Sequence, residues 1–350
     1  MNNKIVRLLT SAILLVTLTL VSACDDSFIF DNEGDCSTKV KFVFTKNRQA
    51  LRSKTGEGPD AFATSVSGVH LFVFNEDTQE LAFEKFESAD NLIDGCMMPV
   101  DLPEGNYSFV AWCGLDSNDE NNAFELQHSY TRADGDNCHI KMASESEPVH
   151  SQKYEALYHG RISNVAVSNS DISRVIELPV VKNTNDIAIW LQNPDASFDS
   201  KEYTVTYEDA NGVIHFSDNS IISEDKTLRY RPHTSSLLAT ETEYNGDLVE
   251  SGALISHISV SRLMASHEDD AKIVVRNPEG EVVFSVPFIK YVLRMQDFTD
   301  GAAKDNQWYL DCEDTYHCSF YLAGAADGTW SATRIIINNW VVVPKQNNEF

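Results

Sequence analysis

The chain has 350 residues, of which 42% are hydrophobic and 10% aromatic, so it carries enough apolar material to build packed domains and does not have the composition of a disordered protein. Its formal net charge of -26 at pH 7 excludes a protein that binds nucleic acid or another polyanion by charge. A chain of this length favours two domains of about 150 residues each.

The first 23 residues have the pattern of a lipoprotein signal peptide. Lys4 and Arg7 give a basic start, residues 8–20 are apolar apart from threonine and serine, and Val-Ser-Ala at 21–23 leads into Cys24. The apolar stretch of 13 residues is too short for a helix that spans about 30 Å of hydrocarbon. We therefore predict cleavage before Cys24, a covalent lipid on that cysteine, and an acidic linker over 24–36. The alternative is an ordinary secretory signal that leaves Cys24 as a plain thiol.

Short stretches that alternate apolar and polar residues follow, separated by Gly, Pro, Asn and Asp, which is the pattern of β-strands and turns. In the first half they cover 40–44, 69–74, 81–83 and 107–112. In the second half they cover 186–191, 203–207, 213–216, 258–263, 272–275, 281–284, 319–322 and 334–343.

Turn residues and one helical pattern complete the expected elements. Asn211-Gly212, between two strand patterns, predicts a hairpin, and Asn-Pro-Glu-Gly at 277–280 predicts a turn. Helical spacing of apolar residues appears once, over 287–295, after Pro287. We predict an all-β protein with little helix, built as two antiparallel β-sandwich domains in tandem over 37–180 and 181–350.

Six cysteines follow Cys24, and an even number in an exported protein is compatible with disulfides. The sequence does not choose among the possible pairings. Only the last two are close enough to close a small loop, so they are a possible disulfide, and the other four lie before residue 140. The six are Cys36, Cys96, Cys113, Cys138, Cys312 and Cys318.

Motifs for catalysis or for cofactor binding are absent from the sequence, so we predict a protein that is not an enzyme, has no cofactor or small-molecule substrate, and binds no metal. Residues 116–122 are rich in Asp and Asn, but a calcium-binding EF-hand loop needs Gly and Glu where this chain has Asn121 and Gln127. A solvated loop is the better interpretation. His257 alternates within a strand pattern, where a packed or surface histidine is expected.

Two further groups have a structural and a functional interpretation. Trp112, Trp190 and Trp340 lie in strand patterns, where core packing is expected and a glycan-binding platform is the alternative. Arg48 and Arg52 follow the first strand pattern, where an ordinary polar loop is expected and cleavage by an arginine-specific protease is the alternative.

The order of these features resembles one family. A lipobox cysteine and an acidic linker come first, followed by Val-Lys-Phe-Val-Phe at 40–44 and Val-His-Leu-Phe-Val-Phe at 69–74. Leu-Pro-Glu-Gly-Asn-Tyr and a strand ending in Trp-Cys-Gly then cover 102–114, and Ile-Ile-Ile-Asn-Asn-Trp-Val-Val-Val at 335–343 closes the pattern. The chain resembles the FimB-type fimbrial anchor lipoproteins of Bacteroidales bacteria over nearly its whole mature length.

The resemblance implies transthyretin-like sandwiches and a lipid-anchored protein at the outer membrane, on the cell surface. Such a protein tethers the base of a fimbrium whose subunits assemble by β-strand addition, limits its length, and keeps its own first strand. Its expected partners are fimbrial structural subunits and, through the lipid, the outer membrane. Alternatives are a minor or tip subunit of the same fimbrium, or a glycan-binding surface lipoprotein. Candidate edges for strand exchange are the first and last strands, with Val40, Phe42, Phe44, Ile335, Ile337 and Val341.

Overall fold

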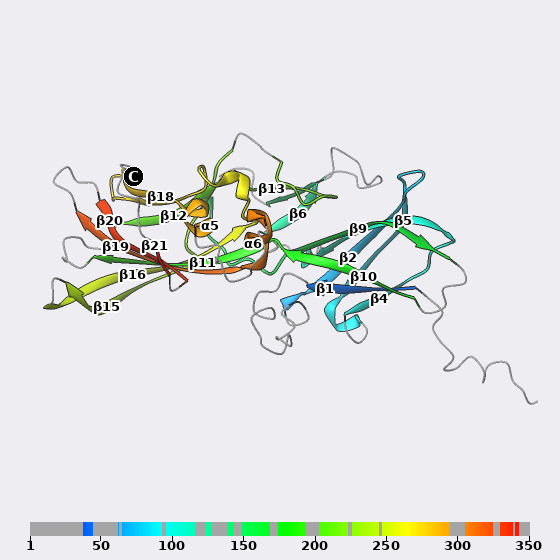
Figure 1. Ribbon diagram of the computed structural model, residues 1–350, viewed down its shortest axis with the longest axis horizontal. Coiled ribbons are helices and arrows are strands. Elements are labelled where there is room, and N and C mark those ends of the chain that lie inside the picture. Colours follow the sequence, from blue (N-terminus) through cyan, green and yellow to red (C-terminus); the bar gives the residue numbers. More distant parts are fainter. Residues whose placement is uncertain are drawn as a thin grey trace, which may run out of the picture.

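The computed structural model contains two β-sandwiches that lie end to end along the long axis of the molecule (Figure 1). The described residues are 38–44, 62, 65–92, 96–115, 123–127, 139–142, 149–168, 174–193, 203–222, 226–244, 247–294, 305–324, 330–338 and 340–342. Strands dominate these residues, and the helices among them are short. The predicted all-β sandwich fold is confirmed.

The first sandwich is one sheet of seven strands that curls around its own core. Alternate residues of a strand point to the same face, and Val69, Leu71 and Val73 of β2 share this core with Val40 and Phe42 of β1. All five side chains are buried, and each contributes about 1.5–3 kcal/mol of hydrophobic stabilisation. In sheet order the strands are β3 (Leu81–Ser88), β2 (Gly68–Asn75), β5 (Gly105–Cys113), β9 (Tyr158–Val167), β10 (Val175–Lys182), β1 (Thr38–Phe44) and β4 (Met97–Val100).

The second sandwich packs two sheets face to face around a second core. The six-stranded sheet has the order β15 (Thr234–Tyr244), β16 (Asp247–Ser261), β11 (Thr184–Asn193), β19 (Thr315–Gly324), β20 (Trp330–Ile337) and β21 (Trp340–Val342). The five-stranded sheet has the order β18 (Val282–Pro287), β17 (Lys272–Arg276), β12 (Thr204–Asp209), β14 (Leu228–Tyr230) and β8 (Val149–His150).

Strands from the two halves of the sequence interleave. β8 precedes residue 180 but pairs with β14 of the second sandwich. A small third sheet joins β13 (Val213–His215) to β7 (His139–Met142) and β6 (Phe124–Gln127). Three pairs, β1–β10, β11–β19 and β8–β14, are parallel, where the alternation predicted antiparallel pairing throughout. Long connections permit this arrangement, because parallel strands cannot be joined by a tight turn. The domain boundary at 180 stays a prediction.

Helix is confined to short pieces. α5 (Phe288–Leu293) begins after Pro287 and buries Phe288, Ile289, Tyr291 and Val292, which confirms the helix predicted there. α6 (Asn306–Cys312) was not predicted. Its N-cap is Asp305, whose Oδ1 accepts a hydrogen bond from the backbone N–H of Trp308 at 2.6 Å. Two single turns are η1 (Ala89–Asn91) and η3 (Ala265–His267).

The turn after β13, in the second half of the chain, packs against β2 and β5 of the first sandwich. Phe216 is buried, with its ring 5.0 Å from that of Phe72 in β2. Trp112 in β5 donates from Nε1 to the backbone oxygen of Phe216 at 3.0 Å. Trp112 is a fully buried core side chain, whereas Trp190 is half-buried. The expected packing role is therefore met at Trp112, and the rings of Phe72, Trp112 and Phe216 form an apolar part of the joint.

A buried ion pair lies close to the same joint. Arg262 donates to both carboxylate oxygens of Asp311 in α6, at 2.8 and 2.9 Å, and also to the backbone oxygen of Asn219. Gln307 donates to Asp311 as well, at 2.9 Å. Asn219 and Asn183 exchange two side-chain hydrogen bonds of 3.0 and 2.6 Å. The hydrogen bonds of one network thus link the end of β10, the turn after β13, the end of β16 and α6.

His159 makes this joint sensitive to acid. Burial, together with the nearby positive charge of Arg262, lowers the pKa of His159 to about 3. The unfolded chain, with a histidine pKa of about 6.5, binds more protons in this range, so stability should fall as the pH drops from about 6.5 toward 3. We expect His159→Gln to reduce the loss of melting temperature between about pH 7 and pH 4. Thermal unfolding across that range measures it.

His267 is a control, because its pKa is shifted in the opposite direction to that of His159. Its Nδ1 lies 2.6 Å from Oδ1 of the buried Asp209, and this hydrogen bond raises the pKa of His267. Its contribution to stability is present at acid pH and is lost as the pH rises through the raised pKa. His267→Gln should therefore increase the loss in acid. Equal slopes in the wild type and in both variants would contradict this account.

Cys312 and Cys318 are not joined as a disulfide, which corrects the pairing predicted from their spacing. Cys312 ends α6 and is not part of the second core, whereas Cys318 lies in the middle of β19 and packs in that core. Burial raises the pKa of the Cys318 thiol, so it packs as a neutral, apolar side chain. The Cys36 and Cys138 predictions lie outside the described residues.

Candidate functional site

The first strand is not an open edge, which corrects one prediction. β1 lies between β10, with which it pairs in parallel, and β4, with which it pairs antiparallel. Val40 and Phe42 are buried, and Phe44 stacks edge-on against Tyr158 at 5.3 Å. The sequence pattern showed that β1 is a strand but not that β4 would pair with its second side.

The last strand pattern is a hairpin and not one strand. β20 ends at Ile337, Asn338 adopts a φ of 44°, and β21 returns antiparallel to β20. Ile335 and Ile337 are fully buried in the interior of the sheet, so they are not edge residues. Val341 alone of the predicted set lies on an edge strand, with 52% of its surface exposed.

Several other predictions lie outside the described residues. These are the lipidation of Cys24, the acidic segment 116–122, the loop with Arg48 and Arg52, and the side chain of Trp340. Among the described residues, no group of three or more His, Cys, Asp or Glu is arranged to hold a metal ion. None of the described helices is long and apolar enough to cross a membrane.

β15 is the longest edge strand in the described part of the chain. It pairs with β16 on one side over its full length, from Thr234 opposite His257 to Tyr244 opposite Asp247. No described strand pairs with its other side. Its main-chain N–H and C=O groups on that side are the groups that a further strand would use.

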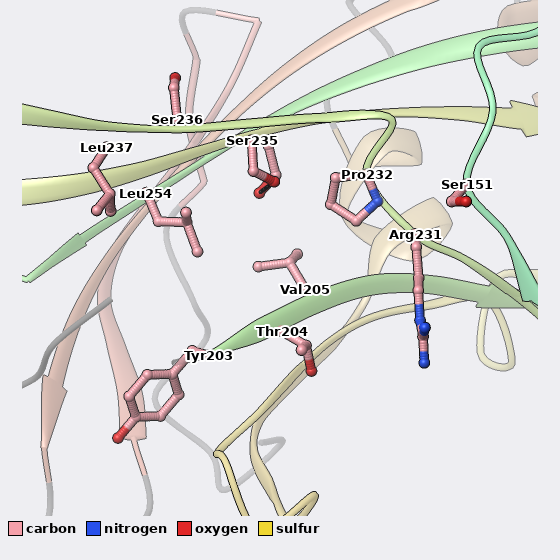
Figure 2. A pocket seen from close by; sticks show the side chains of 11 residues that line it. Ser151, Tyr203, Thr204, Val205, Arg231, Pro232, Ser235, Ser236, Leu237 and Leu254 are labelled. Carbon is pink, nitrogen blue, oxygen red and sulfur yellow. Dashed lines mark hydrogen bonds between the residues drawn. The ribbon is translucent and has the colours of Figure 1, made fainter. Parts of the chain in front are cut away.

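A groove of about 610 Å³ runs beside β15, between the two sheets of the second sandwich. Figure 2 shows Leu237 and Leu254 pointing from β15 and β16 toward Val205 of β12. β14 pairs only with residues Tyr207, Glu208 and Asp209 of β12, and the chain then crosses to the other sheet at Arg231 and Pro232. The remaining lining residues are Ser151, Tyr203, Thr204, Ser235, Ser236 and Ser256.

The crossing fixes one end of the groove. The backbone N–H of Arg231 donates to the oxygen of His150 at 2.6 Å, and that of His233 donates to the oxygen of His257 at 2.9 Å. Burial lowers the pKa of His233, which favours its neutral form. The lining combines apolar side chains, hydroxyls and one charged group, Arg231. Such a surface is suited to binding a chain through its backbone and its apolar side chains, and it holds no acid–base pair for catalysis.

Comparison with known proteins identifies the family. A family model described as "Fimbrillin-A associated anchor proteins Mfa1 and Mfa2" matches residues 32–344. The chain belongs to this family of fimbrial anchor proteins. It is therefore a fimbrium-associated protein of the cell surface. The search of functionally characterised proteins returns no match.

Solved structures share the fold. A candidate polysaccharide-binding protein of Bacteroides thetaiotaomicron has a TM-score of 0.70 and 24% identity, over 90% of this chain and 100% of that one. A candidate adhesin of the same organism has a TM-score of 0.70 and 23% identity, over 89% and 99%. The fimbrial anchor protein Mfa2 of Porphyromonas gingivalis has a TM-score of 0.61 and 14% identity, over 87% and 98%.

Proposed function

We propose that this protein anchors the base of a fimbrium to the outer membrane through lipid on Cys24, and that it limits the length of the fimbrium. The observation that carries the proposal is the match of the anchor family model over residues 32–344. The lipobox pattern that ends at Cys24 supports attachment through lipid. Attachment by more than one acyl chain is stable, whereas a single chain is held only weakly.

The position of β1 supports a role at the base. Val40 and Phe42 of β1 fill the first core, and both sides of the strand are paired. A protein that keeps this strand has no vacant strand position there, so no further subunit can be added at that place. Growth by strand addition would stop at such a subunit.

Deletion of the gene tests the proposal. We expect the major subunit to be made and assembled, but the fimbriae to be shed into the medium or to change in length, because the link to the membrane is lost. Electron microscopy of the cells and an assay of fimbrial subunit in the supernatant measure this. Re-expression of the wild-type chain is the control. Fimbriae of normal length that stay on the cells would contradict the proposal and favour a minor or tip subunit.

A further inference from the structure

The first seven residues of β15 lack the charges and prolines by which proteins normally protect a free edge, and its charged residues, Glu241 and Glu243, lie near its end. Natural edge strands are kept short or carry charges, prolines or bulges, because an open edge recruits other chains. β15 has 11 residues, and its stretch 234–240 contains neither a charged residue nor a proline. By contrast, β3 carries Glu84, Lys85 and Glu87, β4 contains Pro99, and β21 has three residues.

Apolar side chains are exposed along the same strand pair. Leu237 and Leu238 each expose 43% of their surface, and Leu248 exposes 75%. Leu237 also lines the groove, opposite Leu254 in register. A strand laid along β15 would place its alternate side chains in the groove against Leu237, whereas Leu238 points to the opposite face and Leu248 lies on the inner strand β16.

The charge pattern indicates what kind of strand fits. From residue 232 to residue 261 the sequence contains no lysine or arginine, but it contains Glu241, Glu243, Asp247 and Glu250. Glu241 stands directly opposite Glu250 in the register of β15 and β16. Like charges at directly opposite positions destabilise a strand pair, and a cation beside them relieves the repulsion.

We propose that β15 is the docking edge for an extended segment of a fimbrial subunit, one that alternates apolar residues and carries lysine or arginine beside Glu241 and Glu243. This inference rests on the proposed anchor function. β15 and β16 lie in the second sandwich, at the end of the molecule away from β1 (Figure 1). A segment docked there binds away from β1, the first described strand of the chain.

Binding of synthetic peptides to the soluble full chain tests the charge and the site together. The probe is a fluorescent peptide of about nine residues that alternates valine with threonine and has lysine at both ends. Its matched control has glutamate at both ends. We expect the lysine peptide to bind the wild type at least about tenfold more tightly by fluorescence anisotropy, and the double variant Glu241→Lys/Glu243→Lys to reverse this preference. Unchanged preference in the double variant would overturn the proposal.

Proline variants separate the two edges of the six-stranded sheet. Ser236→Pro in β15 should weaken binding of the lysine peptide at least about tenfold, because proline lacks the donor and disrupts pairing, while Val341→Pro in β21 should not. The opposite result would place the docking edge on β21. Self-association of the wild type that Ser236→Pro abolishes, measured by analytical ultracentrifugation, would show that a second copy of the chain occupies β15 and would overturn the proposal.

The same variants in cells distinguish this inference from the anchor function. Cells with Glu241→Lys/Glu243→Lys should shed fimbriae, whereas cells with Val341→Pro should keep them. If the deletion strain sheds fimbriae but the double variant does not, the protein is the anchor and β15 is not its docking edge. If the deletion strain keeps its fimbriae, the anchor function itself fails, whatever the peptides show.

Discussion

Asp311→Ala should lower the free energy of unfolding by about 3–5 kcal/mol, because it leaves the buried guanidinium of Arg262 without its counter-charge. The side chains of Arg262 and Asp311 are 10% and 3% exposed, and Gln307 loses an acceptor in the same change. Urea unfolding of the full chain measures the effect as a shift of the midpoint at constant slope.

Two further variants test whether the loss of stability in Asp311→Ala comes from the burial of the ion pair. Asp269→Ala removes a 2.8 Å ion pair with Lys290, but Asp269 is 69% exposed, so the expected loss is at most about 1 kcal/mol. The double variant Arg262→Met/Asp311→Leu removes both buried charges and should be much more stable than Asp311→Ala. Equal losses in Asp269→Ala and Asp311→Ala would show that the joint does not depend on the buried pair.

Period-two alternation predicted the strands well, because one face of most strands packs on a core. Residues 69–74 became β2, 107–112 fell within β5, and 272–275 became most of β17. The turn at 277–280 is also confirmed. Gly280 adopts a φ of 85°, Asn277 and Glu281 close the turn, and β17 and β18 pair across it.

The Asn-Gly hairpin signal was misleading at one place and overlooked at another. β12 and β13, which flank Asn211-Gly212, do not pair with each other. The side chain of Asn211 is buried instead, donating to the backbone oxygen of Arg262 at 2.9 Å and accepting from Tyr230 at 2.5 Å. The hydrogen bonds of Asn211 to Arg262 and Tyr230 therefore stabilise a buried position for this asparagine, and it does not form a hairpin turn.

The second Asn-Gly, at 245–246, lies between β15 and β16, which pair in register up to Tyr244 opposite Asp247. The preceding residues 240–243 are polar, and Leu248 and Val249 after it are consecutive, so neither side shows the apolar alternation that marks a half-buried strand and the sequence pattern did not reveal this hairpin. The candidate site was missed because Leu237 and Leu238 are consecutive and do not alternate with polar residues, and because an edge strand is exposed in the free protein. The presence of a free edge depends on which strands meet, and alternation within one strand does not contain that information.

Release of the protein together with its fimbriae is the second large effect that we expect. When residues 1–23 are replaced by an ordinary secretory signal and Cys24 by alanine, the chain is exported without lipid and nothing else holds the proposed anchor to the membrane. The fimbriae should then leave the cell with the anchor still bound. Cys36→Ala behind the native signal is the matched control, and its fimbriae should stay attached.

Immunogold electron microscopy of fimbriae collected from the medium tests the central claim most directly. The anchor account predicts that in the variant without lipid most fimbriae are in the medium, and that antibody against this protein labels one end of each. Fimbriae that remain on these cells, or shed fimbriae without the protein at either end, would contradict it.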